Sequence, residues 1–273
     1  MTNKHAIHKQ LTTHNSQLTK YAFTLAETLI VMGIIGVVAA LTLPNLNSST
    51  GDKEKVVKVK KIVQNISEAY SRAQAIYGPV DEWCSGNCPN HTAITNKHGE
   101  RITEFMKVSK NCKTTVGLGC FTPGNTTYID GTKSTPLDTY KPGYRFITSD
   151  GTAVMLSYNS ALCDGNDGVS CPGPYCQKCG MVIVDIDGPN KGPYMVGKDL
   201  LYFYYDKDYG FIPQGGENEK GWSTDAELEK MCFVKKDCTA WIVNNENTDY
   251  LKVDKNGKCP NGTVLSRTVT SCN

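Results

Sequence analysis

The chain has 273 residues, with 29 Lys and Arg against 27 Asp and Glu, and its formal net charge is +2. This near balance of charge, without a basic patch interleaved with aromatic residues, argues against a nucleic-acid-binding protein. The sequence contains no nucleophile elbow and no phosphate-binding loop. His91 and His98, which we place in a loop, have no paired acid or nucleophile, so we expect no catalytic residues and no enzyme.

The N-terminal part of the chain consists of a polar leader and one long apolar run. Residues 1–22 carry three lysines and no acid, which is typical of a basic, disordered leader. Residues 23–44 form the only long apolar run, and Glu27 is its one acid. A helix of this length covers roughly 30 Å, the hydrocarbon thickness of a bilayer. The sequence therefore predicts one transmembrane helix here.

The sequence YAFTLAE, followed by an apolar helix, resembles the prepilin cleavage and methylation motif of type IV pilins and of type II secretion pseudopilins. The resemblance implies that a prepilin peptidase cuts between Ala22 and Phe23 and that the new N-terminus at Phe23 is methylated. Glu27 falls on the acid of the family, and Gly36 and Pro44 fall on its helix glycine and proline. The chain departs from the family at Ala22, where the usual residue is glycine.

The same resemblance implies an assembly role, partners and a location. The amine of Phe23 in one subunit would meet Glu27 of its neighbour, so that two costly buried charges cancel. Other pilin-like subunits, in a homo- or hetero-polymer, would be the partners, together with the prepilin peptidase and the inner-membrane assembly machinery. The chain would cross the bacterial inner membrane once, with a cytoplasmic N-terminus and a periplasmic or extracellular C-terminal domain.

Two observations leave other interpretations of the N-terminus open. Val38-Ala39-Ala40 has the small residues that signal peptidase prefers, and a cut there would release a soluble protein beginning at Leu41. Three lysines precede the apolar run and five follow it within residues 53–61, which by the positive-inside rule favours the opposite orientation. The cysteines favour an exported C-terminal part.

All twelve cysteines follow residue 80. An even number confined to one part of the chain predicts disulfides in an oxidising compartment. Since the cysteines come as close neighbours, we expect the pairs Cys84–Cys88, Cys112–Cys120, Cys163–Cys171, Cys176–Cys179, Cys232–Cys238 and Cys259–Cys272. The alternative is a zinc ion held by the four thiolates of Cys163, Cys171, Cys176 and Cys179.

Periodicity predicts one further long helical segment and four strands. Apolar residues recur every three or four positions over residues 45–78, which indicates an amphipathic continuation of the first helix with a solvated basic face. A short helix is expected at 100–108. Alternating and β-branched runs predict strands at 144–148, 152–158, 181–186 and 200–205, the first two joined by an Asp-Gly turn.

The predicted fold class is α+β. A long N-terminal helix, with a membrane half and an amphipathic half, packs on a small antiparallel sheet with disulfide-rich loops; the resemblance implies a pilin-like fold. The predicted divisions are the leader (1–22), the transmembrane and assembly helix (23–44), the amphipathic continuation (45–78), a cysteine-containing loop region (79–143), the antiparallel sheet (144–214) and a cysteine-rich C-terminal extension (215–273).

An acidic loop lies between the last two predicted strands. Asp185, Asp187, Asn190 and Asp199 offer oxygen ligands that suit a calcium ion, and the pattern resembles a loop that holds calcium in some major pseudopilins. The same residue types also stabilise turns without any metal, and this alternative stays open. We expect no other cofactor to be required.

Together these patterns predict a membrane-anchored, pilin-like structural subunit. It would be processed by prepilin peptidase and polymerised into a type II secretion pseudopilus or a type IV pilus. One alternative is a binding protein, such as a minor pilin or anchored adhesin, that uses its cysteine-rich loops to bind a surface, a glycan or DNA. A second alternative is a secreted soluble cysteine-rich protein, held by disulfides or by zinc.

Overall fold

The structure, a computed structural model, describes residues 24–84, 87–158, 163, 178–192, 194–215 and 225–272, with the backbone alone for residues 39–50, 225 and 227. The chain divides into two compact units, Met1–Ser49 and Thr50–Asn273. The first unit contains the beginning of a long helix. The second contains the end of that helix and all the other described elements. The finer divisions expected from the sequence stay a prediction.

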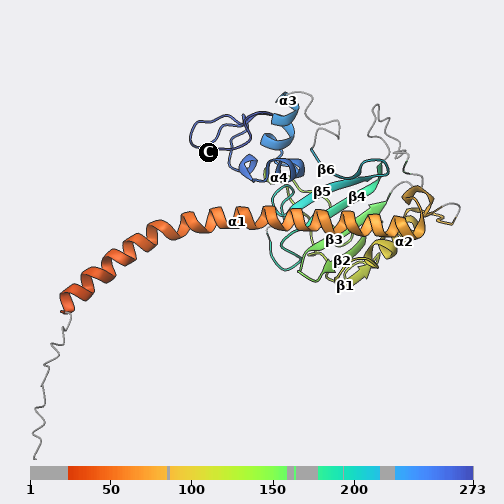
Figure 1. Cartoon of the computed structure of the whole chain (residues 1–273), viewed down its shortest axis with the longest axis horizontal. Coiled ribbons are helices and arrows are strands. Elements are labelled where there is room, and N and C mark those ends of the chain that lie inside the picture. Colours follow the sequence, from red (N-terminus) through yellow and green to blue (C-terminus); the bar gives the residue numbers. More distant parts are fainter. Residues whose placement is uncertain are drawn as a thin grey trace, which may run out of the picture. The chain divides into compact units, whose positions relative to one another are not determined.

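One long helix comes first, and short helices and six strands follow it (Figure 1). The helices are α1 (Leu25–Tyr77), η1 (Val80–Glu82), α2 (His91–Thr103), α3 (Asp225–Leu228), η2 (Glu229–Val234), α4 (Thr239–Asn245) and η3 (Asp249–Leu251). The strands are β1 (Val108–Lys113), β2 (Tyr144–Thr148), β3 (Ala153–Tyr158), β4 (Lys178–Asp185), β5 (Leu200–Asp206) and β6 (Gly210–Pro213).

Helix α1 has a clear signal at each end. At its start, Thr24 accepts a hydrogen bond from the backbone N–H of Glu27 at 3.2 Å, and Glu27 accepts one from the N–H of Thr24 at 2.9 Å. This reciprocal pair is a capping box. At the other end, Gly78 adopts a φ of 81°, the left-handed conformation that favours glycine, and Pro79 cannot continue the helix.

The sheet is an antiparallel meander in which spatial order follows sequence order, from β1 to β6. The predicted Asp-Gly turn joins β2 and β3, where Gly151 has a φ of 90° and donates to the carbonyl of Thr148 at 3.0 Å. The register of β3 on β4 places Tyr158 opposite Gly180. That register matters for the disulfides described below.

One face of the sheet shares an apolar core with residues 50–77 of α1. Val59, Ile62, Ile66, Ala69 and Ala73 are all at most 2% exposed and recur at helical spacing. They belong to one cluster with buried residues of β2, β3, β4 and β5. Each fully buried Val or Ile side chain contributes roughly 1.5–3 kcal/mol. Figure 1 shows this part of α1 running across the strands.

The other face of the sheet is covered by the segment that follows β1. A second, smaller cluster joins Phe121 and Leu137 of this segment to Met155, Ile183 and Leu200 on β3, β4 and β5. The disulfide between Cys112 and Cys120 belongs to the same cluster. Both faces of the central strands are therefore buried, which explains why β3 has no exposed residue.

Helix α2 begins nine residues before the helix expected at 100–108. Asn90 caps it by accepting the N–H of Ala93 at 2.9 Å. Ile94, His98 and Ile102 form its buried stripe at four-residue spacing. This apolar stripe could not be recognised in the sequence, because a histidine occupies its central position. His91 and His98 therefore lie on a helix, and placing them in a loop was wrong.

The fold class predicted from the sequence is wrong. It combined a helix whose first half spans a membrane with a small sheet of four strands, in a pilin-like arrangement. The sheet has six strands, because β1 and β6 extend it at its two edges. The sequence of β1, VSKNCK, lacks the β-branched and aromatic residues typical of strands, and β6 has only four residues.

The predicted single-pass location in the bacterial inner membrane is contradicted as well. In the parts of the chain that the structure describes, no helix is long and apolar enough to cross a membrane.

Candidate functional site

The described cysteines form five disulfides: Cys84–Cys88, Cys112–Cys120, Cys163–Cys179, Cys232–Cys238 and Cys259–Cys272. Four of the predicted pairs are confirmed. The predicted pairs Cys163–Cys171 and Cys176–Cys179 are wrong, and Cys171 and Cys176 themselves lie outside the described residues. The register of β3 on β4 explains the difference, because it places Tyr158 opposite Gly180, the neighbour of Cys179, and Cys163 follows Tyr158 by only five residues.

The Cys163–Cys179 disulfide also bears on the zinc alternative. Zinc is held by thiolates, and the sulfur atoms of a disulfide are not thiolates. Two of the four proposed ligands are therefore committed to each other.

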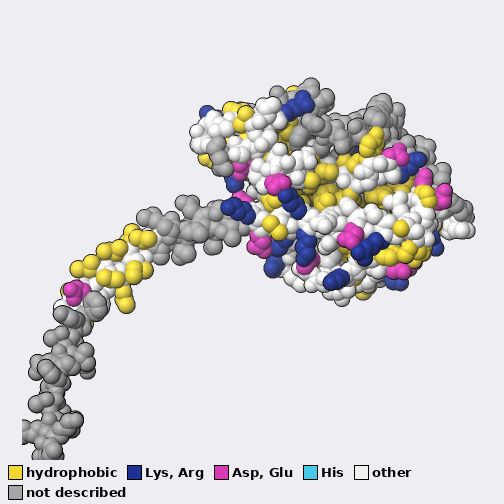
Figure 2. Space-filling view, viewed as in Figure 1, with side chains coloured by type: hydrophobic (Ala, Val, Ile, Leu, Met, Phe, Trp, Pro, Cys, Tyr) yellow, Lys and Arg dark blue, Asp and Glu magenta, His cyan; other side chains and the backbone are white. Residues whose placement is uncertain are grey.

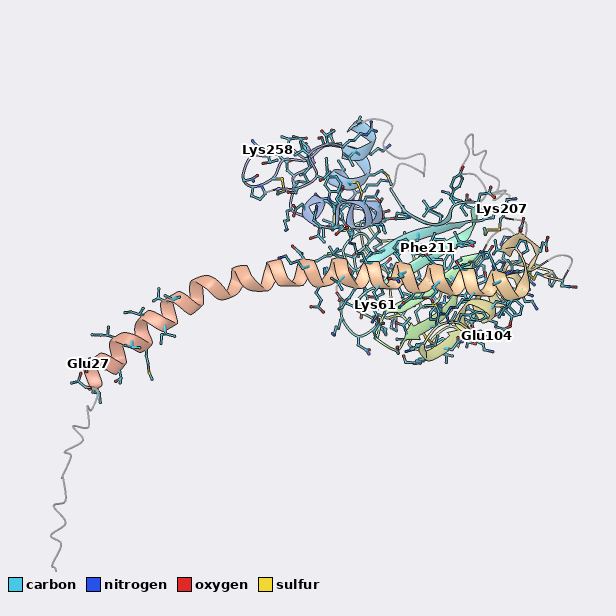
Figure 3. The ribbon with its side chains drawn as sticks, in the orientation of Figure 1. Glu27, Lys61, Glu104, Lys207, Phe211 and Lys258 are labelled. Atoms are coloured by element: carbon cyan, nitrogen blue, oxygen red, sulfur yellow. A yellow bond between two sulfur atoms is a disulfide. The ribbon has the colours of Figure 1, made fainter. Side chains whose placement is uncertain are left out.

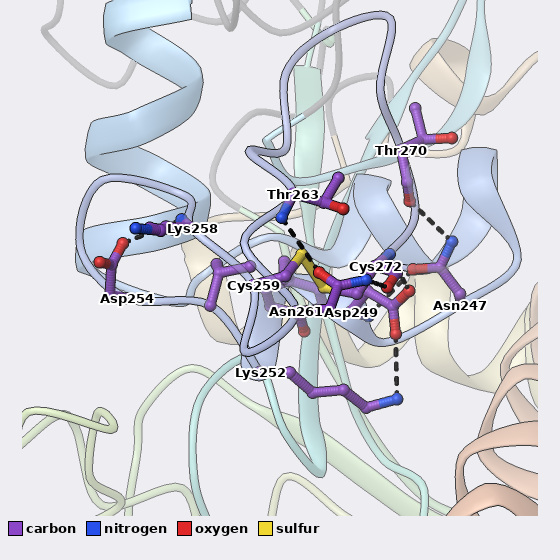
Figure 4. Close-up of a disulfide and its surroundings, with 12 residues drawn as sticks. Asn247, Asp249, Lys252, Asp254, Lys258, Cys259, Asn261, Thr263, Thr270 and Cys272 are labelled. Atoms are coloured by element: carbon purple, nitrogen blue, oxygen red, sulfur yellow. Dashed lines mark hydrogen bonds and ion pairs between the residues drawn. A yellow bond between two sulfur atoms is a disulfide. The ribbon is translucent and has the colours of Figure 1, made fainter.

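The C-terminal extension is held by a disulfide and by hydrogen bonds around it (Figure 4). The carboxylate of Asp249 accepts the N–H of Cys272 at 2.8 Å and the ammonium of Lys252 at 2.9 Å. Lys252 also pairs with Asp52 of α1 at 2.9 Å. The side chain of Asn247 donates to the carbonyl of Thr270 at 3.0 Å. The tail is thereby fixed to the second unit next to α1.

The beginning of α1 exposes apolar side chains, and those on the face drawn in Figure 2 lie next to one another. Leu25 is 79% exposed, Met32 is 72% exposed and Val38 is 53% exposed, and the apolar residues between them are similar. Exposed apolar side chains that lie together in this way are typical of protein or membrane interaction sites. Ala22 and Phe23, the predicted cleavage and methylation residues, lie outside the described residues.

Glu27 lies at the start of α1 (Figure 3) and is engaged by Thr24. Its carboxylate accepts the backbone N–H of Thr24 at 2.9 Å and the hydroxyl of Thr24 at 2.8 Å. These hydrogen bonds, the backbone one first, hold the pKa of Glu27 below its usual value. The sequence signal for this contact is the Thr-x-x-Glu capping box at 24–27, which the sequence analysis overlooked.

Gly36 and Pro44, the other two predicted assembly residues, both lie within α1. A Cβ atom added at Gly36 would have no neighbour within 4 Å. The glycine therefore leaves open space on the helix surface. For Pro44 the structure describes only a helical backbone.

In the acidic loop between β4 and β5, Asp185 and Asp199 are completely buried. One oxygen of Asp185 accepts the N–H groups of Asp187 at 3.2 Å and Gly188 at 3.0 Å. The two oxygens of Asp199 accept the N–H groups of Tyr194 and Met195, both at 2.7 Å. Both carboxylates therefore shape the loop through its backbone, which is the turn chemistry that the sequence left open.

The electrostatics of this acidic loop favour protonation. Burial, and then the negative charge of Asp199, raise the pKa of Asp185 to about 7. Burial also raises the pKa of Asp199. The backbone hydrogen bonds of Asp199 and the charge of Lys55 on α1 lower the same pKa, but by less than burial raises it. The second oxygen of Asp185 is buried and has no hydrogen-bond partner among the described groups.

Two of the four predicted calcium ligands have other surroundings. Asp187 forms an ion pair with Lys58 of α1 at 3.3 Å, and Asn190 is exposed. Over the described ranges, no group of three or more His, Cys, Asp or Glu side chains is close enough to hold a metal ion. Calcium binding by Asp185, Asp187, Asn190 and Asp199 stays a prediction.

The lysines of α1 make ion pairs across the second unit, so their interpretation as a solvated basic face was incomplete. Besides Lys58, Lys60 pairs with Glu246 at 2.6 Å and Lys61 with Asp150 at 2.8 Å. All three pairs are partly exposed, and each contributes at most about 1 kcal/mol. They align the helix on the loops at this end of the sheet.

An open groove of about 510 Å³ lies between α2 and the edge strand β1. Its polar lining comprises Glu100, Thr103 and Glu104 of α2, Ser109, Lys110, Asn111 and Lys113 of β1, and Tyr144 of β2. The hydroxyl of Tyr144 accepts a hydrogen bond from the amide of Asn111 at 2.8 Å and lies 3.3 Å from the hydroxyl of Thr103. The groove is shallow and open to solvent over most of its extent.

This groove carries both signs of charge and several hydroxyl and amide groups. Glu100 and Lys113 form an ion pair across it at 3.6 Å. Such a lining suits a neutral polar ligand that offers many hydroxyl groups. The sequence analysis missed the groove because it predicted neither β1 nor the correct bounds of α2.

Comparison of the chain with protein-family models, with curated proteins and with solved structures gave no match.

Proposed function

We propose that the chain is an exported, disulfide-stabilised binding protein without catalytic activity. The observation that supports this proposal most is the set of five disulfides in the second unit. Structural disulfides persist in oxidising compartments and are rare in the cytosol. They stabilise a unit that works outside the cell, where binding proteins of the adhesin and minor-pilin kind act.

The test of this first step is the oxidation state of the cysteines in protein isolated from its own cells. We expect disulfide mapping by mass spectrometry, with free thiols blocked before lysis, to recover all five described pairs. Recovery of Cys163 and Cys179 as free thiols, or in complex with zinc, would overturn the proposal.

The binding site we propose is the groove between α2 and β1, and the ligand class is a glycan. Support comes from the exposed amide of Asn111 and from the ion pair of Glu100 and Lys113 across the groove. The chain's near-neutral charge disfavours DNA as the ligand.

Screening of the full chain on a glycan array, followed by titration of the best ligand, tests the site. Asn111→Ala, which removes the amide from the groove, should weaken binding at least about tenfold. Lys258→Ala changes an exposed lysine of the C-terminal extension (Figure 3) and is the matched control. Equal affinity of the two variants would exclude the groove, and no binding on the array would exclude a glycan.

A pilin-like filament subunit is the second candidate function. The exposed apolar residues from Leu25 to Val38 favour it, because the same helices from other copies of the chain would cover them. N-terminal sequencing of the mature protein tests this candidate directly. A mature chain beginning at Phe23 is the expected result, and one beginning at Leu41 would reject it.

A further inference from the structure

His98 occupies the centre of the interface between α2 and the sheet. Its side chain is completely buried. Its ring stacks on Tyr158 of β3 with 3.9 Å between ring centroids, and the ring of Trp83 lies 4.9 Å away on another side. Neither ring nitrogen has a hydrogen-bond partner among the groups that the structure describes. Among the described residues, the contacts that hold the imidazole are therefore aromatic packing contacts.

The groups around His98 offer nothing that would stabilise a positive charge by pairing. The titratable and charged groups that face this pocket are Tyr70 of α1, Arg101 of α2, Tyr158 of β3 and Tyr205 of β5. Within the described chain no carboxylate forms an ion pair with His98, and Arg101, one turn further along α2, is itself a cation. The phenol of Tyr205 already accepts a hydrogen bond from Gln74 at 2.9 Å.

Protonation of His98 is therefore opposed by the folded state. Burial, and then the charge of Arg101, lower the pKa of His98 from its ordinary 6.5 to about 3. When α2 is undocked, His98 meets water and regains its ordinary pKa. Between these two values the undocked state binds more protons than the docked state. The docking of α2 is consequently strongest above pH 6.5 and weakens as the pH falls toward 3.

The rest of the α2 interface is small. Only Ile94, Thr95, His98, Gly99 and Ile102 of this helix are buried. Thr95 accepts the N–H of Tyr158 at 3.0 Å. The sheet itself is independently supported on its other face by the second apolar cluster, to which α2 contributes no residue.

We propose that α2 is an acid-released element: protonation of His98 undocks α2 from β2 and β3 while the central strands of the sheet stay folded. Because Glu100, Thr103 and Glu104 of α2 line the groove, its release would dismantle the groove. This consequence rests on the proposed binding function of the groove. The release of α2 does not, since it depends only on the packing of His98.

Hydrogen–deuterium exchange of the oxidised full chain, without ligand, tests the release. Exchange is followed by mass spectrometry between pH 8 and pH 3 and normalised to the intrinsic rate at each pH. In the unmodified chain, peptides covering α2 should lose protection between pH 6.5 and 3, at a higher pH than peptides covering β4. In His98→Gln the loss should move to lower pH by at least one unit.

The controls lie on the same helix. His91→Gln changes the exposed first residue of α2 and should behave as the unmodified chain. Arg101→Gln removes the neighbouring cation and should also move the loss to lower pH. The proposal is overturned if His98→Gln and Arg101→Gln both leave the transition unchanged, or if α2 and β4 lose protection together. Should His98→Gln not fold, Arg101→Gln decides alone. Absence of glycan binding would contradict the proposed binding function of the groove but not the release of α2.

Discussion

The carboxyl group of Asp185 is buried, and one of its oxygens accepts hydrogen bonds from two backbone N–H groups. Its pKa of about 7 exceeds the value of 3.8 for an exposed aspartate. The folded state therefore binds more protons between pH 4 and pH 7, and the contribution of this group to stability is lost as the pH rises through that window. Above pH 7 the protein carries a buried negative charge at Asp185, next to the carboxylate of Asp199.

We predict that Asp185→Asn stabilises the protein at pH 8 by about 1–3 kcal/mol and that the gain disappears near pH 4. The amide keeps one oxygen as acceptor for the two N–H groups but cannot ionise. Urea unfolding with EDTA present, at pH 4 and pH 8, measures the difference, and the partly exposed Asp187→Asn is the control. If Asp185→Asn is less stable than the unmodified chain only when calcium replaces EDTA, the carboxylate of Asp185 instead binds a calcium ion.

Glu27 has a structural role in the cap of α1 and a proposed functional role in filament assembly. One pair of variants separates the two roles. Glutamine also completes a capping box, so Glu27→Gln removes the charge and keeps the cap, whereas Thr24→Ala removes the cap and keeps the charge. If the charge sets subunit contacts, Glu27→Gln abolishes filament assembly, scored by electron microscopy, and Thr24→Ala retains it. Normal assembly of Glu27→Gln would reduce Glu27 to a helix cap.

At the scale of elements, the β4–β5 loop is locked to the C-terminal extension at Gly197. This glycine has a φ of 79°, and a Cβ atom built on it would lie 1.6 Å from the carbonyl oxygen of Lys236. Lys236 is itself buried, and its ammonium donates to the carbonyls of Tyr250 and Val253. The acidic loop and the extension therefore fit together through backbone contact, which no side chain could replace.

We expect Gly197→Ala to cost at least about 3 kcal/mol of stability, because both the backbone conformation and the contact forbid a side chain. Gly210→Ala is the matched control: its φ is 74°, but an added Cβ atom there has no neighbour within 4 Å. That control should lose only about 1 kcal/mol. If denaturant unfolding gave equal losses of stability for the two variants, the backbone at Lys236 would have to move away from the added Cβ atom at little cost.

At the scale of the whole molecule, the described disulfides all close short loops, and each stabilises the fold by restricting the unfolded chain locally. Removing the Cys259–Cys272 bond as a Cys259→Ala, Cys272→Ala pair should cost about 3 kcal/mol, since it closes a loop with a sequence separation of 13. The Cys84–Cys88 bond, with a separation of 4, should cost about 2 kcal/mol. Non-reducing thermal unfolding compares the two, and the reverse order would contradict the loop-entropy argument.

The sequence predicted the central strands and failed at the periphery, for physical reasons. β2, β3, β4 and β5 carry apolar and β-branched residues because they are buried, and burial is what periodicity detects. β1 is an edge strand with lysines, which protect an edge but remove the strand signal. The groove is formed by β1 and α2 together. Because β1 was not predicted and α2 was predicted with other bounds, the groove could not be predicted from the sequence.

The candidate site was predictable only in part. Sequence alone pointed to Asp185 and Asp199, and the structure buries both of them in the same loop region. It did not reveal that Asp187 pairs with Lys58, or that Cys163 reaches Cys179, because each contact depends on register and helix placement. Neighbours along the chain are a poor guide wherever a hairpin folds it back on itself.

The meander order of the sheet has a consequence for how the chain matures. Each strand pairs with the next one along the sequence, and the described disulfides span separations of only 4 to 16 residues. A chain that emerges N-terminus first into an oxidising compartment can complete each strand pair and each disulfide before the following segment arrives. Correct pairing is thereby available during translocation itself, with little need for later reshuffling between distant cysteines.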